Sequence, residues 1–117
     1  MTAAVEAATL GGMTASAAFI AMVEELLAGL GPVAVRRMFG GAGLYADGVM
    51  FALVADDVLY LKADDTTRQH FEAEGCGPFV YAGQGKPVTM SYWRAPERLY
   101  DDGEQMCAWA GRALAVA

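Results

Sequence analysis

The chain is poor in the residues from which most metal and redox sites are built. It has two cysteines, Cys76 and Cys107, and one histidine, His70, among 117 residues. The cysteines form no C-x-x-C pair, and too few soft ligands remain for a zinc site, so we predict neither a metal nor a cofactor. We expect both cysteines to be free thiols, because a single pair in a chain without a recognisable secretion signal is more often unbonded.

Long hydrophobic runs are also missing, although 56% of the residues are apolar. The longest apolar stretch, ASAAFIAMVEELLAGL, is interrupted by Glu24 and Glu25, short of the ~20 residues that a membrane span requires. The first residues include Glu6 and no base, so they do not resemble a secretory signal, and we predict a disordered lead-in over residues 1–13. We expect a single domain over residues 14–117, located in the cytoplasm and not bound to a membrane.

Basic residues are scarce: there are 8 against 14 acidic residues, for a net charge of −6. The acidic excess lies mainly toward the two ends of the chain, and Arg36-Arg37 is the only adjacent basic pair. Affinity for nucleic acid depends on clustered lysine and arginine. The sequence therefore argues against direct nucleic-acid binding, and we expect any binding to duplex DNA to be weaker than the roughly 10⁻⁸ M of dedicated readers.

Apolar spacing and turn signals predict the elements in the order helix, strands, helix, strands, helix. The first helix is expected to begin at Thr14 or Ser16 and to end near Leu30, with Met22 on its buried face. Asp47-Gly48 separates two apolar runs and is a strong hairpin signal. The order predicts a two-layer α+β fold, with an antiparallel sheet and flanking helices arranged α-β(3-4)-α-β(2)-α, rather than a doubly wound parallel sheet.

The glycine-rich stretch MFGGAGLYADG offers two interpretations. Residues 41–46 formally match G-x-G-x-x-G/A, the fingerprint of dinucleotide binding. That fingerprint must open a helix whose N-terminal amides receive the phosphates, whereas here a hairpin turn follows at once. We therefore predict that residues 41–46 connect two strands and bind no nucleotide.

Groups for catalysis are few. His70 lies in the middle of a predicted helix and is expected to be an ordinary surface or rim residue rather than a general base. Three pairs of acids stand at turns or helix starts, where carboxylates accept hydrogen bonds from free backbone N–H groups: Asp56-Asp57, Asp64-Asp65 and Asp101-Asp102. We predict that the chain is not an enzyme, and the alternative is a small-ligand or enzymatic domain built around Tyr45, Tyr60 and Trp93.

Alternation along the strands predicts large apolar side chains on both faces of the sheet. The face toward the helices is expected to carry Phe51, Leu53, Leu59, Leu61, Val88, Met90 and Tyr92. The other face is expected to carry Met50, Ala52, Val54, Val58, Tyr60, Lys62, Thr89, Ser91 and Trp93.

The helices of a two-layer domain cover one face of its sheet, so an apolar second face indicates a partner. We expect this partner to be a second copy of the chain, forming a homodimer, together with an unknown protein partner. Nearby bases could contribute to such an interface. The candidate interaction surface comprises Arg36, Arg37, Tyr45, Tyr60, Lys62, Trp93 and Arg94.

Three segments, together with a helix that carries Trp109, resemble one known family. They are RRMFGGAGLYADGVMFALVADD, the run VLYLK, and GKPVTMSYWRAPE, and in this order they are similar to the TfoX N-terminal domain family, which is named for regulators of natural competence. The resemblance covers about residues 15–115 and implies an α+β fold grouped with secretion-chaperone-like folds. It also implies a non-enzymatic regulatory or protein-interaction domain, with a competence-linked regulator that contacts nucleic acid indirectly as the alternative. The competence regulators carry a second, helical domain, and because this chain stops at Ala117 we expect a stand-alone version.

Overall fold

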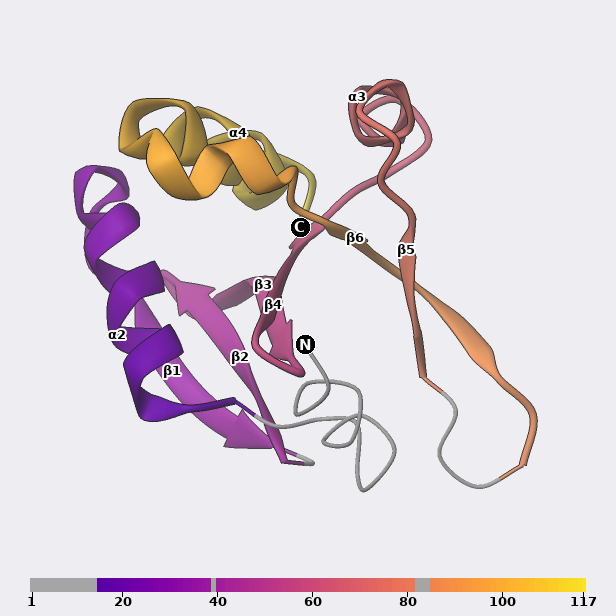
Figure 1. Ribbon diagram of the computed structural model, residues 1–117, viewed down its shortest axis with the longest axis horizontal. Helices are drawn as coiled ribbons and strands as arrows, with labels where there is room; N and C mark the ends of the chain where they lie inside the picture. Colours follow the sequence, from indigo (N-terminus) through magenta and orange to yellow (C-terminus); the bar gives the residue numbers. More distant parts are fainter. Residues whose placement is uncertain (1–14, 39, 82–84) are drawn as a thin grey trace.

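The computed structural model describes residues 15–38, 40–81 and 85–117, and the predicted lead-in over residues 1–13 lies outside them (Figure 1). The described residues form a six-stranded antiparallel sheet with its helices on one face, which confirms the α+β prediction. The elements are α2 (Ala17–Leu26), the short 3₁₀-helix η1 (Ala28–Leu30), β1 (Ala34–Met38), β2 (Gly41–Ala46), β3 (Val49–Ala55), β4 (Val58–Lys62), α3 (Arg68–Ala73), β5 (Pro78–Tyr81), β6 (Val88–Arg94), η2 (Glu97–Asp101) and α4 (Gly103–Val116).

The strands lie in the order β1-β2-β3-β4-β6-β5. The first four form a meander in which each strand pairs with the next, and β5 and β6 form a separate hairpin that joins the meander through the pairing of β6 with β4. Figure 1 shows α2 and α4 beside the meander and α3 beside one end of the β5–β6 hairpin. The four-plus-two division of the strands around α3 agrees with the predicted element order.

The N-termini of α2 and α4 are each capped by the polar residue that comes just before the helix. Ser16 Oγ accepts a hydrogen bond from Phe19 N at 3.1 Å, and Asp102 Oδ1 accepts one from Gln105 N at 3.1 Å, so both predicted caps are confirmed. The first helix is shorter than predicted, because α2 ends at Leu26 and a 3₁₀ turn follows. Met22 is 37% exposed, so its predicted burial was wrong.

Two tight turns join the strands of the meander. Asp47 has φ 52° and Gly48 has φ 78°, as a type I′ hairpin turn requires, which confirms the predicted Asp-Gly turn. The next turn is made by Asp56 and Asp57, with φ 54° and 53°. Asp57 Oδ1 accepts a hydrogen bond from Ser16 N at 2.8 Å, so this turn also fixes the start of α2.

Asp56 gives a first testable prediction, because its Oδ1 is buried and has no hydrogen-bond partner among the described residues. Asp56→Asn keeps the shape and the left-handed backbone, which asparagine tolerates well, and replaces the carboxylate, whose Oδ1 is buried without a partner, by a neutral group that costs less to bury. We expect the free energy of unfolding to rise by about 1 kcal/mol in urea titrations. The matched change Asp57→Ala should lower it by about 1 kcal/mol, because it removes the bond to Ser16. A destabilising Asp56→Asn would contradict this account.

The main core lies between the sheet and the helices. Its largest fully buried side chains come from α2 and the residue after it, from β2, β3 and β4, and from η2 and α4: Val23, Leu27, Leu44, Phe51, Val54, Leu59, Leu61, Leu99 and Met106. Burial of this set accounts for the apolar faces of α2 and α4, since each helix presents one stripe to the sheet. In the described part of the chain, no helix is both long and apolar enough to cross a membrane.

The predicted alternation fails inside β3. Leu44 pairs with Ala52 and Tyr45 pairs with Met50, so Phe51 is an extra residue on β3, a β-bulge. Phe51 and Ala52 therefore both face the helices, and every later residue of β3 is shifted by one. Val54 lies in the main core and Leu53 on the other face, which is the reverse of the prediction.

The alternation predicted for β6 is also reversed. Trp93 packs against the main core, with its ring centroid 6.2 Å from that of Phe71 in α3. Met90 and Tyr92 lie on the opposite face. Each of the two rows of β6 holds a large aromatic residue, so the pattern alone could not fix which row faces the helices.

The glycine stretch is a strand rather than a connection. Gly40, with φ 82°, lies between β1 and β2, and Gly41–Ala46 forms β2 in the interior of the sheet, paired on both sides. The prediction that residues 41–46 link two strands was therefore wrong. No helix begins at this stretch.

Candidate interaction surface

The face of the sheet that points away from the helices is called the open face here. One row of directly paired residues crosses five strands of it: Arg36 on β1, Gly43 on β2, Leu53 on β3, Tyr60 on β4 and Arg94 on β6. Paired residues in an antiparallel sheet point to the same side. The row therefore has a positive charge at each end and small or apolar residues between.

A second, smaller hydrophobic cluster lies on this face. Its buried members are Leu53, Ala55, Phe79 and Tyr92, and Met50, Tyr60 and Met90 pack against them. The rings of Tyr60 and Phe79 have centroids 5.0 Å apart. The open face of the sheet thus carries a small hydrophobic core of its own, and none of the described helices covers it.

An apolar groove of about 290 Å³ opens into this cluster and is called the methionine groove here. Its walls come from β1, β3, β5 and β6, and it is lined by Met38, Met50, Leu53, Phe79, Tyr81, Met90 and Tyr92. Tyr92 Oη donates a hydrogen bond to the Met50 carbonyl at 3.4 Å. Methionine is flexible and polarisable, so a groove with three of them can adapt to different apolar groups.

Gly43 makes room for the methionines. A Cβ atom at this position would lie 2.9 Å from Met38 Cε and 3.1 Å from Met50 Cε, closer than ordinary contacts. The missing side chain lets both thioether ends lie over β2. This close approach gives the glycine-rich stretch a packing role in place of the phosphate contact that its motif suggests.

The predicted surface residues divide between the two faces. Register places Arg36, Tyr60 and Arg94 on the open face, and Tyr45 pairs with Met50 there. Lys62 pairs with Tyr92, and its Nζ lies 5.1 Å from the Tyr92 ring centroid and 2.5 Å from Ser91 Oγ.

Arg37 and Trp93 lie on the helix side instead. The Arg37 guanidinium donates a hydrogen bond to the Ala15 carbonyl just before α2, and Trp93 packs against α3. The prediction that Tyr60, Lys62 and Trp93 share one face of the sheet is therefore wrong. Met38 and Gly43 were not predicted as part of this surface, because only the pairing of β1 with β2 and of β2 with β3 brings them beside Met50.

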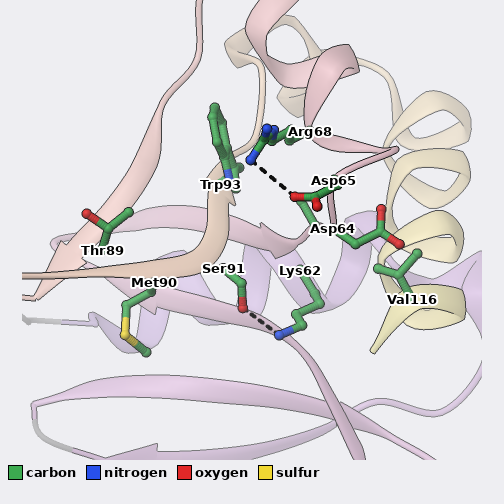
Figure 2. A pocket seen from close by; sticks show the side chains of 10 residues that line it. Lys62, Asp64, Asp65, Arg68, Thr89, Met90, Ser91, Trp93 and Val116 are labelled. Atoms are coloured by element: carbon green, nitrogen blue, oxygen red, sulfur yellow. Dashed lines mark hydrogen bonds and ion pairs between the residues drawn. The ribbon is translucent and has the colours of Figure 1, made fainter.

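A polar pocket of about 580 Å³ lies where β4 and β6 meet the turn before α3 (Figure 2), and its lining includes Lys62 and shares Met90 with the methionine groove. Arg68 Nη1 pairs with Asp65 Oδ1 at 3.2 Å, and Figure 2 shows Trp93 near Arg68 with Met90 on the other side of β6. Asp64 Oδ1 accepts hydrogen bonds from the hydroxyl and backbone N–H groups of Thr66 and Thr67, which lower the pKa of Asp64 to about 2. This carboxylate organises the turn before α3, in line with the predicted capping role.

The other titratable candidates are placed as predicted. His70 is exposed and its ring lies at the edge of Trp109, with centroids 6.2 Å apart. Cys76 and Cys107 are free thiols, and burial raises the pKa of Cys76 above its usual value. Cys107 Sγ lies 3.3 Å from the Leu26 carbonyl at the end of α2.

Three tyrosines give a prediction for alkaline pH. Burial raises the pKa values of Tyr60, Tyr92 and Tyr100 above the ordinary value of 10.0. Between the unfolded and the folded pKa the folded chain binds more protons, so stability that is present below pH 10 is lost as the pH rises through the folded values. Urea unfolding should show a falling free energy of unfolding above about pH 10. Tyr60→Phe should reduce this slope without changing the stability at pH 7, and an equal slope in both proteins would contradict the assignment.

The fold and its open face define a small α+β domain that carries an uncovered apolar groove between basic side chains. The chain belongs to the TfoX N-terminal domain family, whose pattern matches residues 25–117. The match includes all six strands, α3 and α4. Membership confirms the resemblance found in the sequence.

Two relatives bear names that point to a process. Protein Sxy of Escherichia coli (strain K12) is 35% identical over 77 residues, which is 66% of this chain. The DNA transformation protein TfoX1 of Aliivibrio fischeri (strain ATCC 700601 / ES114) is 35% identical over 68 residues, or 58% of this chain. The matched segments make up only 37% and 32% of these two proteins, so this chain corresponds to about a third of their length.

Proposed function

We propose that this chain is a non-enzymatic regulatory domain that acts in the cytoplasm by binding a protein partner. The observation that carries the proposal is the open face, where the methionine groove is left uncovered by every described helix. Contiguous exposed apolar surface is typical of sites that bind another molecule. The name of one relative, a DNA transformation protein, supports a regulatory setting.

Self-association is the second candidate, because the same uncovered face favours it. A second copy would cover the groove and would bury Met50 and Met90. Sedimentation of the purified chain at tens of micromolar decides between the two, since a dimer through this face would become a monomer when Met90 is replaced by lysine. A monomeric wild type leaves the binding of a different protein.

Protein-partner binding is tested by capture from a native lysate on the immobilised chain. We expect at least one protein to be retained in a saturable manner after nuclease treatment and after removal of small molecules by dialysis. The control is the same chain unfolded and coupled at equal density. If no protein is retained above that control, or if retention depends on nucleic acid, the proposed function is wrong.

A further inference from the structure

Basic and acidic residues are distributed unevenly between the strands and the rest of the chain. The six strands contain four bases, Arg36, Arg37, Lys62 and Arg94, and no acid, although the whole chain has a net charge of −6. Helix α2 carries the exposed Glu24 and Glu25 on the other layer. The strands thus carry only basic charge, and the acids of the meander, Asp47, Asp56 and Asp57, lie in its turns.

Three of these bases lie on the open face without an ion pair to a described residue. Arg36 lies over the Tyr45 ring, with its Cζ 5.5 Å from the centroid, and Lys62 lies over Tyr92. The ion pairs within residues 15–38, 40–81 and 85–117 are those of Arg68 with Asp65 and of Arg98 with Glu74. Arg36, Lys62 and Arg94 therefore have no carboxylate partner in the described structure.

These bases surround an apolar site. Arg36 and Arg94 stand at the two ends of the row that passes through Leu53, whose side chain lines the methionine groove. A binding partner that fits must offer negative charge at two separated places and an apolar group between them. Such a partner would be attracted to this face and repelled by the rest of the acidic molecule.

We propose that the open face binds an acidic segment of another protein, with one large apolar side chain inserted in the methionine groove and carboxylates paired with Arg36 and Arg94. This inference rests on the proposed function and specifies the partner's chemistry. Arginine at the rim and an apolar anchor in a pocket are the elements from which interface affinity is usually built. The adaptable methionines would accept leucine, methionine or phenylalanine as the anchor.

A second copy of the chain fits this face less well. Two open faces related by a twofold axis present the same surface to each other. Both surfaces would then bring Arg36, Lys62 and Arg94, and neither would bring an acid from its strands. Like charges at an interface oppose association.

Single-stranded nucleic acid also fits less well, despite its negative charge. Binding of that kind needs exposed aromatic rings on which bases stack. Phe79 and Tyr92 are each only 9% exposed and the Tyr45 ring is covered by Arg36, so Tyr81, at 39% exposure, is the most exposed ring in the groove lining and forms no row of stacked rings by itself. The face provides a pocket for a side chain in place of a stacking platform.

The test uses a phage-displayed library of random dodecapeptides, selected on the full wild-type chain. We expect the selected peptides to be rich in aspartate and glutamate around one large apolar residue. In fluorescence anisotropy, a selected peptide should lose about 10-fold or more in affinity to the Arg36→Glu/Arg94→Glu variant. It should also bind more weakly at high salt. The matched control is Lys86→Glu/Arg68→Glu, which reverses two exposed bases outside the strands and should bind as the wild type does.

The groove is tested separately with a change that alters neither charge nor size. Met50→Gln/Met90→Gln makes the groove polar and should lower the affinity for the same peptide about 10-fold. Met22→Gln, at an exposed position of α2, should leave that affinity unchanged. Circular dichroism of each variant checks that it folds. Peptides without acidic bias, equal binding to the charge-reversed variant, or equal loss in both controls would overturn the inference.

Failure of this inference can be told from failure of the proposed function. If the open-face variants capture the same lysate proteins as the wild type does, a protein partner exists but binds elsewhere, and only the inference is wrong. If neither lysate proteins nor peptides bind the wild type, both are wrong. If the selected peptide binds but a single-stranded dT oligonucleotide competes for it through Arg36 and Arg94, the assignment to protein is wrong.

Discussion

Replacing Phe51 with alanine is expected to lower the free energy of unfolding by about 3–5 kcal/mol. Phe51 is fully buried and is the extra residue of the β3 bulge, so its ring fills the space between the meander and the helices. Alanine would leave a cavity that the neighbouring backbone cannot close, because the bulge is held by the pairs Leu44–Ala52 and Tyr45–Met50. A loss of this size is a large fraction of the stability of an ordinary domain.

Chemical unfolding followed by circular dichroism measures this effect. Phe51→Leu is the control, since it keeps most of the volume and should cost clearly less than the alanine change. Leu53→Ala tests the bulge itself, because Leu53 belongs to the small cluster on the open face. If Leu53→Ala destabilised the chain more than Phe51→Ala, the shift in alternation described here would be wrong.

Replacing Trp109 with alanine is expected to cost about 3–5 kcal/mol as well. Trp109 is 6% exposed and meets the Phe71 ring edge to face, with centroids 5.1 Å apart and an angle of 86° between the planes. The Arg112 guanidinium lies 4.7 Å from its ring centroid. The side chain therefore joins α4 to α3, and its loss removes a large buried area together with these ring contacts.

The fluorescence of Trp93 can report this change, because the Trp93 ring lies next to the same Phe71 ring, with centroids 6.2 Å apart. In Trp109→Ala its emission should shift to longer wavelength at a lower urea concentration than in the wild type. Trp109→Phe keeps an aromatic ring and should be destabilised by about half as much or less. Wild-type stability of Trp109→Ala would show that α3 is held by other contacts.

The element order could be predicted from the sequence because its signals are local. Asp47-Gly48 permits the positive φ values of a hairpin turn, Ser16 and Asp102 supply oxygen atoms to free N–H groups, and the face of α4 follows from apolar spacing. Each of these depends on residues close together in the chain. The family resemblance depended likewise on short motifs in a fixed order.

The composition of the open face could be predicted only in part, because it depends on register. The bulge at Phe51 adds one residue to β3 that has no partner on β2, and the spacing of apolar residues in the sequence does not predict it. The prediction therefore assigned Leu53 and Val54 to the wrong faces of the sheet. It also placed Trp93 beside Tyr60, although the pairing of β6 with β4 puts Arg94 there. The methionine groove escaped notice for the same reason, since its walls come from strands far apart in sequence.

The pairing of β4 with β6 has a consequence for how the chain folds. The meander and the β5–β6 hairpin each form from neighbouring segments. The pairing of β4 with β6, in contrast, closes a loop that contains α3 and β5. Closing that longer loop carries the larger entropic cost. We therefore expect the pairing of β4 with β6 to form late in folding and to limit the folding rate. The methionine groove takes residues from both halves, so on this pathway it is completed only when the two halves dock. A partially folded chain would then be unable to engage its partner, which makes completion of folding a condition for recognition.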